Sequence, residues 1–467
     1  MSYHLPIPYL SCGLLLMLIG AVVCFPRFAL SKTRRDAVVL LGCSLMAFTS
    51  ALWSLHGQAD EKIYLDPMLP WLETDAVDGL PLVVFNLITL MAVCLAPRRD
   101  IQNKSLSGIF LLCMGTTLTY TAANLLVLNL GWWLTCIPFV SGMFGVSPDR
   151  KHTNIALISS AVMLSLSTIF LHATAISSLA SISHLSLIFF IMTIVTRKGL
   201  FPLHSWTLRS FETGPLLPKS LLFNSHLGAL LVARAESVGL PPFAQQALYG
   251  LSLLALVTAL VTSLRGLIEK KPRRLMALVC ISQASFILAG LLAANSAGIM
   301  GGMLHWMVVA LASTGLIAVV RILEVRVIDV ADSTSNLGLA VRAPRLATFF
   351  LISGLALVGL PGTMGYCAED LLFHGVQDHH PWMGVFLLVA TAINAINLMR
   401  LYSLLFLGVL PKNVIEIPDA MPRERLPLVM MVLILIVGGL YPALPISLRA
   451  TAMKKFHLVL PDASDHR

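Results

Sequence analysis

The chain has 467 residues, of which 57% are hydrophobic and only 12% are charged. Soluble proteins carry about 25% charged residues, and a soluble chain this poor in charge could not cover its surface. The composition therefore excludes a soluble enzyme, a disordered chain and a disulfide scaffold, and it predicts an all-α polytopic membrane protein. The net charge of +9 is typical of lysine and arginine in cytoplasmic loops, so no nucleic-acid partner is expected.

Apolar runs long enough to cross a bilayer recur along the whole sequence. They predict about fourteen spans, at 8–25, 37–55, 79–97, 106–121, 123–143, 154–173, 179–203, 217–236, 242–265, 273–293, 296–322, 344–376, 382–408 and 425–448. The first run has no basic segment before it, so it is expected to be a retained helix.

Two of the predicted spans contain helix-breaking residues. The seventh runs into Lys198-Gly199-Leu200-Phe201-Pro202, and the twelfth contains Gly359-Leu360-Pro361-Gly362. Membrane helices tolerate such breaks where the freed backbone groups line a polar cavity. Spans seven and twelve are therefore predicted to be broken helices.

Basic residues gather in the loops that follow odd-numbered spans. These residues are Lys32, Arg34, Arg35, Arg98, Arg99, Lys104, Arg150, Lys151, Arg265, Lys270, Lys271, Arg273 and Arg274. The loop after the second span is acidic, with Asp60, Glu61, Asp66, Glu73, Asp75 and Asp78 against Lys62. Because positive loops stay in the cytoplasm, the pattern predicts an external N-terminus. Fourteen spans would also place the C-terminus outside, and the basic residues Lys454 and Lys455 in that tail argue against this arrangement.

Cofactor and metal motifs are absent from the sequence. The eight cysteines form no CxxC pair, and there is neither a GxGxxG nor a P-loop pattern. The longest polar stretches, 56–78 and 323–343, are too short to build a separate enzyme domain. We therefore expect no cofactor, no metal and no catalytic chemistry in this chain, and any such chemistry is expected of a partner chain.

Five ionisable side chains are predicted to lie inside or beside membrane spans, where charge is costly and commonly functional. They are Lys198, His226, His305, Glu369 and Asp370. Each also has a structural interpretation: Lys198 could snorkel to an interface, His305 could bond a backbone carbonyl, and the two carboxylates could cap a half-helix. Together, groups that can exchange protons in broken or central spans indicate proton or ion translocation.

Three segments resemble a known family. They are Arg197-Lys198-Gly199-Leu200-Phe201-Pro202-Leu203-His204-Ser205-Trp206, then Arg273-Arg274-Leu275-Met276-Ala277 followed by Ile281-Ser282-Gln283, and Gly359-Leu360-Pro361-Gly362-Thr363-Met364-Gly365-Tyr366 followed by Glu369. Their order and spacing, over about residues 105–410, resemble the antiporter-like membrane subunits shared by respiratory complex I, Mrp antiporters, membrane-bound hydrogenases and inorganic-carbon-accumulating complexes.

The resemblance implies fourteen core helices with two inverted five-helix repeats. It divides the chain into helices 1–3 (1–104), a first repeat (105–237), a second repeat (238–410), and a last helix with a short tail (411–467). It also implies a pathway: Lys198 matches the central lysine of span seven, Glu369 matches the second centre on span twelve, and His305 lies between them. His226 on span eight would serve the first half-channel, and Asp370 is the neighbour of Glu369.

The sequence departs from the family pattern at three positions. Trp133, in Leu130-Gly131-Trp132-Trp133, stands where a glutamate usually partners the span-seven lysine, and Glu212 is a candidate substitute. Val309 and Ser313 stand where a histidine and a lysine are usual on span eleven. A buried lysine without a nearby carboxylate pays an unpaired-charge penalty, so the first half-channel is expected to be altered or idle.

Three functions remain open at this stage. The leading hypothesis is a proton- or cation-translocating subunit of a multi-subunit complex in the cell inner membrane. A narrower alternative is the membrane subunit of an inorganic-carbon uptake complex that couples proton flow to a carbonic-anhydrase-like partner. The third is a non-conducting scaffold for a partner enzyme. The expected partners are other membrane subunits, a peripheral cytoplasmic enzyme subunit and the lipid bilayer.

Overall fold

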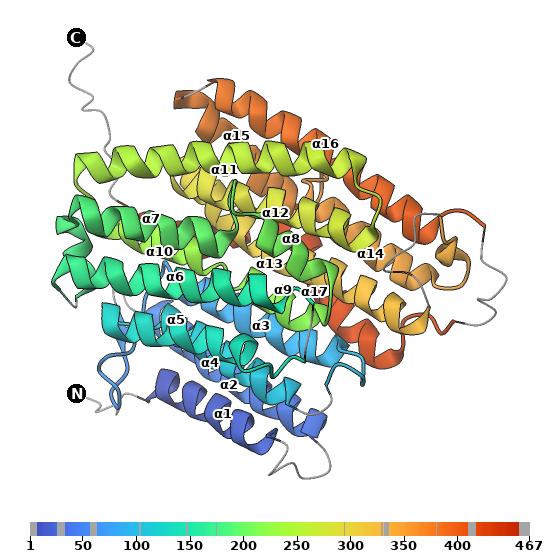
Figure 1. Ribbon diagram of the computed structural model, residues 1–467, viewed down its shortest axis with the longest axis horizontal. Helices are drawn as coiled ribbons and strands as arrows, with labels where there is room; N and C mark the ends of the chain where they lie inside the picture. The colour runs from blue at the N-terminus through green and yellow to red at the C-terminus, as the bar shows by residue number, and fades with distance from the viewer. Residues whose placement is uncertain are drawn as a thin grey trace.

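The computed structural model is a bundle of α-helices that run side by side along its long axis (Figure 1). It describes residues 7–25, 33–56, 63–101, 104–145, 148–173, 175–293, 295–327, 330, 336–379, 381–409 and 417–456. The helices are α1 (Tyr9–Val23), α2 (Thr33–His56), α3 (Gly79–Leu95), α4 (Ser105–Tyr120), α5 (Leu125–Val140), α6 (Arg150–Leu171), α7 (His184–Lys198), α8 (Ser205–Glu212), α9 (Leu216–Asn224), α10 (Leu227–Val238), α11 (Pro242–Ile268), α12 (Pro272–Leu291), α13 (Ser296–Arg326), α14 (Pro344–Leu357), α15 (Met364–His379), α16 (Pro381–Phe406), α17 (Pro422–Leu440) and α18 (Ala443–Met453).

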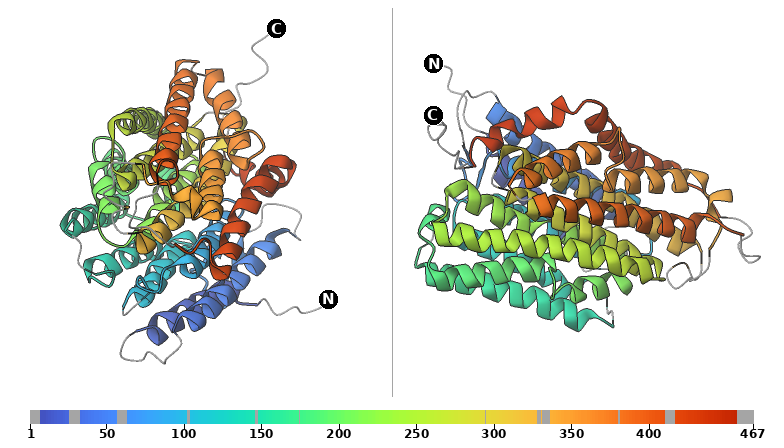
Figure 2. Two further views of the ribbon diagram at one scale, coloured as in Figure 1. Left: turned by 90° about the vertical axis from the view of Figure 1, so that its right-hand side faces the viewer. Right: turned by 90° about the horizontal axis from the view of Figure 1, so that it is seen from above.

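Short elements complete the chain. Two 3₁₀ turns lie at Ile176–Ser181 and Leu339–Val341, and a two-stranded antiparallel pair joins β1 (Tyr64–Leu65) to β2 (Glu73–Thr74). In Figure 2 the blue helices α1 and α2 lie at one edge of the molecule, and the orange α15 and α16 lie at the opposite edge. The central helices α12 and α13 are buried along most of their length, because neighbours surround them on all sides.

The all-α polytopic prediction is confirmed. Seven described helical segments are long and apolar enough to cross a membrane, and the bent pair α17 and α18 makes an eighth. Five shorter apolar helices, α1, α3, α4, α5 and α14, accompany them. Each predicted span coincides with a helix or a helix pair, although the number of actual crossings and the inverted repeats remain predictions.

The two predicted breaks occur where glycine and proline were seen. Span seven ends at Lys198, passes Gly199 in a left-handed conformation, and resumes as α8. Span twelve is divided into α14 and α15 across Gly359, whose φ is +72°. A left-handed backbone is cheap only for glycine, which explains why these residues stand at the breaks.

Two further breaks correct the prediction of continuous spans. Span eight is interrupted between α9 and α10 at Ser225 and His226, and His226 itself has a φ of +44°. The last span bends by 82° after Leu440, so the tail contains an additional helix, α18. Neither break has a left-handed glycine like Gly199 and Gly359, although Gly438, Gly439 and Pro442 flank the bend after Leu440.

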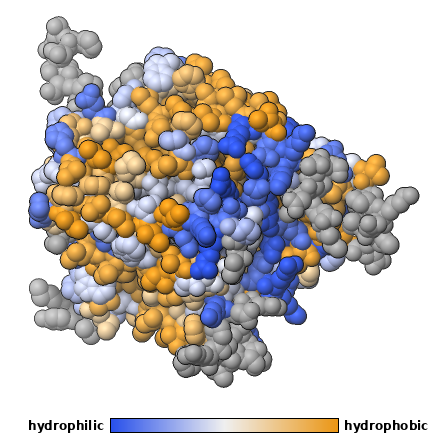
Figure 3. Space-filling view, viewed as in Figure 1, coloured by the Kyte–Doolittle hydropathy of each residue, from blue (hydrophilic) through white to orange (hydrophobic). Residues whose placement is uncertain are grey.

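Charged residues gather at the two ends of the bundle and leave an apolar surface between them. Hydrophobic residues cover most of the face in Figure 3, whereas hydrophilic residues form a band over the region of α8. At that end Arg321 pairs with Asp100, and Arg326 pairs with Glu424. This is the end that carries the basic loops, and we call it the basic end. Lys32, Asp60, Glu61 and Lys62 lie outside the described residues.

The opposite end, which we call the acidic end, holds a buried ion cluster. Arg234 of α10 contacts Asp78 at 2.5 Å, and Lys455 contacts Asp75 at 2.7 Å. Arg449 of α18 is fully buried and donates to the carbonyl oxygens of Ala76 and Val77. Lys455 thus neutralises part of the acidic loop, which accounts for a basic residue at this end.

We expect Arg234→Met to lower the free energy of unfolding by about 3–5 kcal/mol, because removing one partner leaves Asp78 buried and unpaired. Thermal unfolding in mild detergent measures the change. Arg345→Met is the control, since Arg345 is 56% exposed beside Asp419 and such surface pairs contribute about 0–1 kcal/mol. Equal effects of the two substitutions would contradict a structural role for the Arg234–Asp78 pair.

Candidate functional site

The first polar centre lies where α7 and α9 stop in the middle of the bundle. Lys198 is the last residue of α7, and its Nζ lies 3.2 Å from Nδ1 of His226, at the break between α9 and α10. Both side chains are buried, at 8% and 1% exposure. Lys198 is therefore directed into the protein and does not snorkel to an interface. The structure brings together two residues that were predicted separately.

A second cation, Arg197, occupies the side of α7 that faces α5. Its guanidinium lies 5.2 Å from the ring centre of Trp132 and donates a 2.8 Å hydrogen bond to Thr135 Oγ1. Trp133 points elsewhere and donates from Nε1 to Ser165 of α6. Adjacent helical residues point about 100° apart, so Arg197 meets α5 while Lys198 meets α10.

Glu212 does not replace the missing carboxylate of α5. It pairs with Lys271 at 3.0 Å and with Arg274 at 3.4 Å, at the basic end of the molecule. The prediction that Glu212 could replace the carboxylate missing from α5 was therefore wrong. Glu212 is the last residue of α8, which follows the break after Lys198 and leads to the basic end. In the described part of the chain, no ion pair with a carboxylate involves Arg197 or Lys198.

The second polar centre joins α12, α13 and α15. His305 Nε2 lies 3.0 Å from the carbonyl oxygen of Gln283, as its structural interpretation predicted, while His305 Nδ1 has no hydrogen-bond partner among the described residues. The Gln283 side chain is fully buried, and neither of its polar atoms has a hydrogen-bond partner in the part of the chain that the structure describes. Glu369 is buried near Gln283 and Thr391, and its Oε1 has no hydrogen-bond partner among the residues that the structure describes.

The break in span twelve holds Glu369 in place. A Cβ on Gly359 would lie 2.5 Å from Glu369 Oε2, so only glycine leaves room for the carboxylate there. Glu369 lies beyond the first turn of α15 and does not cap it. Asp370 points away: its side chain is 50% exposed and lies 3.6 Å from His374. The two neighbouring carboxylates therefore face different surroundings.

Aromatic rings fill the space between the two centres. The rings of His226 and Trp306 lie 6.3 Å apart, and Trp306 is the neighbour of His305 on α13. Tyr120 lies 6.3 Å from the same indole and donates from its hydroxyl to the carbonyl oxygen of Ser225. The order through the bundle is thus Lys198, His226, His305 and then, through Gln283, Glu369.

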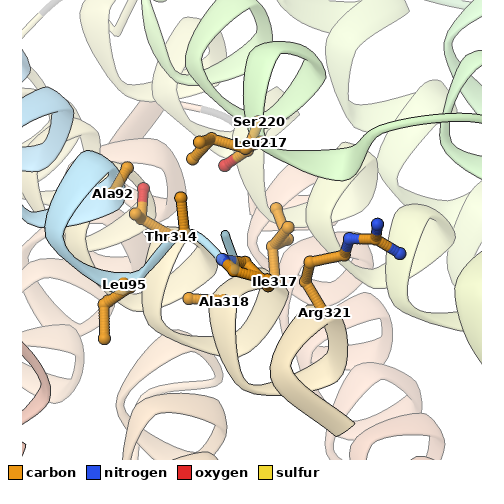
Figure 4. Close-up of a pocket in the computed structure, with 10 residues that line it drawn as sticks. Ala92, Leu95, Leu217, Ser220, Thr314, Ile317, Ala318 and Arg321 are labelled. Atoms are coloured by element: carbon orange, nitrogen blue, oxygen red, sulfur yellow. The ribbon is translucent and has the colours of Figure 1, made fainter. Parts of the chain in front are cut away.

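A small cavity opens between α3, α9 and α13. It has a volume of about 20 Å³, and Figure 4 shows Ser220 and Thr314 on opposite walls, with the Arg321 guanidinium directed away from them. Such a volume holds about one water molecule. The amide nitrogen of Asn224 lies 3.5 Å from Ser220 Oγ and 2.9 Å from Thr314 Oγ1. Ser313, which replaces the expected lysine, donates to Asn224 Oδ1.

Sequence reasoning missed several residues of these centres. Arg197 was treated only as a neighbour of Lys198, and Gln283 only as part of a matching segment. Asn394 was not considered; it is fully buried and donates to Ser282 Oγ at 2.7 Å. A buried amide or an arginine in an apolar helix was the available signal, because such groups are costly in a membrane.

Comparisons with known proteins agree with the fold. Residues 122–394 match the family described as NADH:quinone oxidoreductase/Mrp antiporter, TM. NADH-quinone oxidoreductase subunit M of Rhodobacter capsulatus is 26% identical over 263 residues, which cover 55% of this chain and 50% of that protein. Subunit N of Desulforamulus reducens is 24% identical over 407 residues, which cover 80% of this chain and 83% of that protein.

Solved structures extend the likeness to nearly the whole chain. A chain of respiratory complex I from Thermus thermophilus superposes with a TM-score of 0.84 at 20% identity, covering 96% of this chain and 99% of that one. A chain of the Mrp complex from Dietzia gives 0.82 at 16% identity, covering 97% and 98%. At such identities the likeness shows the fold alone. The family match spans more than half of the sequence, and the chain therefore belongs to the NADH:quinone oxidoreductase/Mrp antiporter transmembrane family.

Proposed function

We propose that this chain is a proton- or cation-translocating subunit of a multi-subunit membrane complex. The observation that carries the proposal is the row of buried polar groups across the middle of the bundle: Lys198, His226, His305 and Glu369. Charged and polar groups at this depth are expensive and are typical of ion pathways. Family membership supports the proposal but does not identify which ion is translocated.

The two centres would act in sequence. Lys198 and His226 exchange a proton directly, because their nitrogen atoms lie within hydrogen-bond distance. His305 and Glu369 form the second site, with Gln283 between them. The aromatic rings between the centres exclude bulk water and prevent a continuous leak. Asp370 lies outside this row and is proposed as a peripheral member of the pathway.

Proton flux across a sealed membrane tests the proposal. The chain is purified with its co-purifying partners and reconstituted into liposomes that contain a pH-sensitive dye. A potassium diffusion potential then drives protons inward. We expect a flux above that of protein-free liposomes, whereas a flux no greater than the lipid background would favour the non-conducting scaffold.

The partners are proposed to be other membrane subunits and a peripheral cytoplasmic enzyme subunit. Similar chains come from respiratory complex I, from an Mrp complex and from a membrane-bound sulfane sulfur reductase. The chains that co-purify with this protein in mild detergent would identify the complex to which it belongs. A carbonic-anhydrase-like partner would select the inorganic-carbon alternative, whereas a redox arm or small Mrp-like subunits would exclude it.

The chain is proposed to lie in the cell inner membrane with its N-terminus outside, so that the basic end faces the cytoplasm. We expect an impermeant maleimide added to whole cells to label Met68→Cys and not Lys104→Cys. Met68 is exposed near the acidic end, and Lys104 is exposed near the basic end. Labelling of the parent chain is the blank. The opposite labelling pattern would invert the proposed topology.

A further inference from the structure

A cavity with basic walls lies at the basic end of the molecule, outside the proposed pathway. It opens between the end of α5 and the first turns of α6 and α9, and its volume is about 30 Å³. Arg150 and Asn154 line it from α6, Lys219 lines it from α9, and the ring of Phe139 lines it from α5. We call this cavity, with Arg150, Asn154 and Lys219, the α6–α9 pocket.

Lys219 carries a charge that its surroundings do not neutralise. Its side chain is buried, and its Nζ donates to the carbonyl oxygen of Thr213. Among the residues that the structure describes, no ion pair joins Lys219 to a carboxylate. Asp149 lies near it and accepts a 3.2 Å hydrogen bond from Thr213 Oγ1, whereas Arg273, also nearby, is paired with Glu324. A buried ammonium is costly without a negative partner, so an anionic ligand is expected here.

Arg150 forms the second basic wall, and helix capping accounts for only part of its guanidinium. Its Nη2 donates to the carbonyl oxygen of Val140, the last residue of α5. A Cβ on Gly142 would lie 2.9 Å from Arg150 Nη1, so glycine leaves room for the guanidinium there. Arg150 Nε is buried without a hydrogen-bond partner among the described residues, and so is Oδ1 of Asn154, one turn further along α6.

Two helices begin at this cavity and add partial positive charge to it. α6 begins at Arg150, and α9 begins at Leu216 after Pro215, which also lines the cavity. Neither helix has a hydrogen bond from a capping side chain at its start. The first turn of a helix attracts anions through its free N–H groups and through the helix dipole. The helix starts therefore reinforce the attraction of Lys219 and Arg150 for an anion.

The size of the cavity suits the phosphate group of a ligand. One water molecule needs about 10–15 Å³ of such space, so the cavity holds two or three groups of that size. The two unesterified oxygens of a phosphodiester carry its negative charge and match this number. They would accept charge-assisted hydrogen bonds from Lys219 and Arg150. A hydroxyl group beyond the phosphate would donate to Asn154 Oδ1.

The surroundings of the cavity favour a lipid over a soluble anion. Exposed apolar side chains continue from it along both neighbouring helices: Ile137 and Val140 of α5, and Ile155 and Ile158 of α6, are all more than a third exposed. On its other side α6 contacts α8, over which Figure 3 shows the hydrophilic band. A head group in the cavity would thus leave its acyl chains beside α5 and α6. Basic pockets between membrane helices are typical sites for anionic head groups.

We propose that the α6–α9 pocket binds the head group of an anionic phospholipid such as phosphatidylglycerol. Lys219 and Arg150 bind the phosphate, Asn154 accepts a hydrogen bond from a hydroxyl of the head group, and the acyl chains lie on the exposed faces of α5 and α6. The site requires a bilayer around the chain but no movement of protons, so it is independent of the proposed function.

Native mass spectrometry of the purified complex, depleted of lipid and titrated with phosphatidylglycerol, tests the proposal. We expect the double variant Lys219→Gln, Arg150→Gln to bind this lipid about tenfold or more weakly, because two charge-assisted hydrogen bonds are lost. The matched control is Lys151→Gln with Lys270→Gln, which removes the same charge from exposed side chains at the same end and should leave the affinity unchanged. Unchanged affinity in the pocket variant would overturn the proposal.

The choice of a lipid as the ligand is tested in the same titration. Phosphatidylcholine with the same acyl chains should bind about tenfold more weakly, since choline adds a positive charge and has no hydroxyl donor. Glycerol 3-phosphate that binds as tightly as the lipid would show a site for soluble anions. Lipid that binds only after the co-purifying chains are removed would show that a partner fills the pocket. Either result overturns the proposal. Arg150→Gln alone serves if the double variant does not assemble, and Lys219→Arg should keep the binding.

Discussion

Glu369→Gln should reduce proton flux through the reconstituted complex by about a hundredfold or more, because glutamine cannot take up or release the proton. The substitution keeps the size and most of the hydrogen-bonding capacity of the side chain. Packing against Gly359 should therefore survive, and the complex should assemble. Flux is measured under a potassium diffusion potential, and assembly is measured by co-purification.

Asp370→Asn is the matched control for this substitution. It makes the same chemical change at the adjacent residue, whose side chain is half exposed beside His374. We expect a much smaller loss of flux from Asp370→Asn than from Glu369→Gln. Equal losses, or a greater loss from Asp370→Asn, would show that Glu369 is not the exchanging carboxylate.

Lys198→Ala should lower proton flux by about tenfold or more without preventing assembly, because His226 loses the group with which it shares a hydrogen bond. Lys198→Arg sharpens the test, since arginine keeps the charge and does not release its proton. We expect arginine to be nearly as damaging as alanine. Lys151→Ala, on the exposed start of α6, controls for loss of a positive charge.

Two results would contradict the assignment of Lys198. Full flux in Lys198→Ala would make the first centre idle, as the missing carboxylate on α5 first suggested. Full flux in Lys198→Arg would mean that only a fixed positive charge is needed beside His226. Either result leaves the test of Glu369 unaffected, because the two centres lie on different helices.

The spans and two of the four breaks could be predicted from sequence because their causes are local. A run of about twenty apolar residues has few alternatives to a membrane helix, and glycine beside proline ends one. The break at His226 could not be predicted, because no glycine or proline stands there. A histidine held in a left-handed conformation reflects tertiary packing, which overrides local preference.

The residue types of the site could be predicted from the sequence, but the directions in which their side chains point could not. Lys198, His305 and Glu369 were marked by charge or polarity inside apolar runs, and all three are buried. The rotation of α7 about its axis determines which helix each of its side chains faces. The contact between Arg197 and α5 could therefore not be predicted from the sequence. Asn394 and Asn397 stand out as amides in an apolar run, but only packing reveals that Asn394 bonds Ser282 of α12 and Asn397 bonds Ser263 of α11.

The buried ion cluster at the acidic end has a consequence for the order in which the chain is completed during synthesis. Asp78 precedes its partner Arg234 by 156 residues, and Asp75 precedes Lys455 by 380. A chain made from its N-terminus presents both carboxylates early and supplies their cations late. The loop before α3 therefore reaches its final form only after α18 has emerged, so a truncation that removes α18 should leave the earliest helices unfinished.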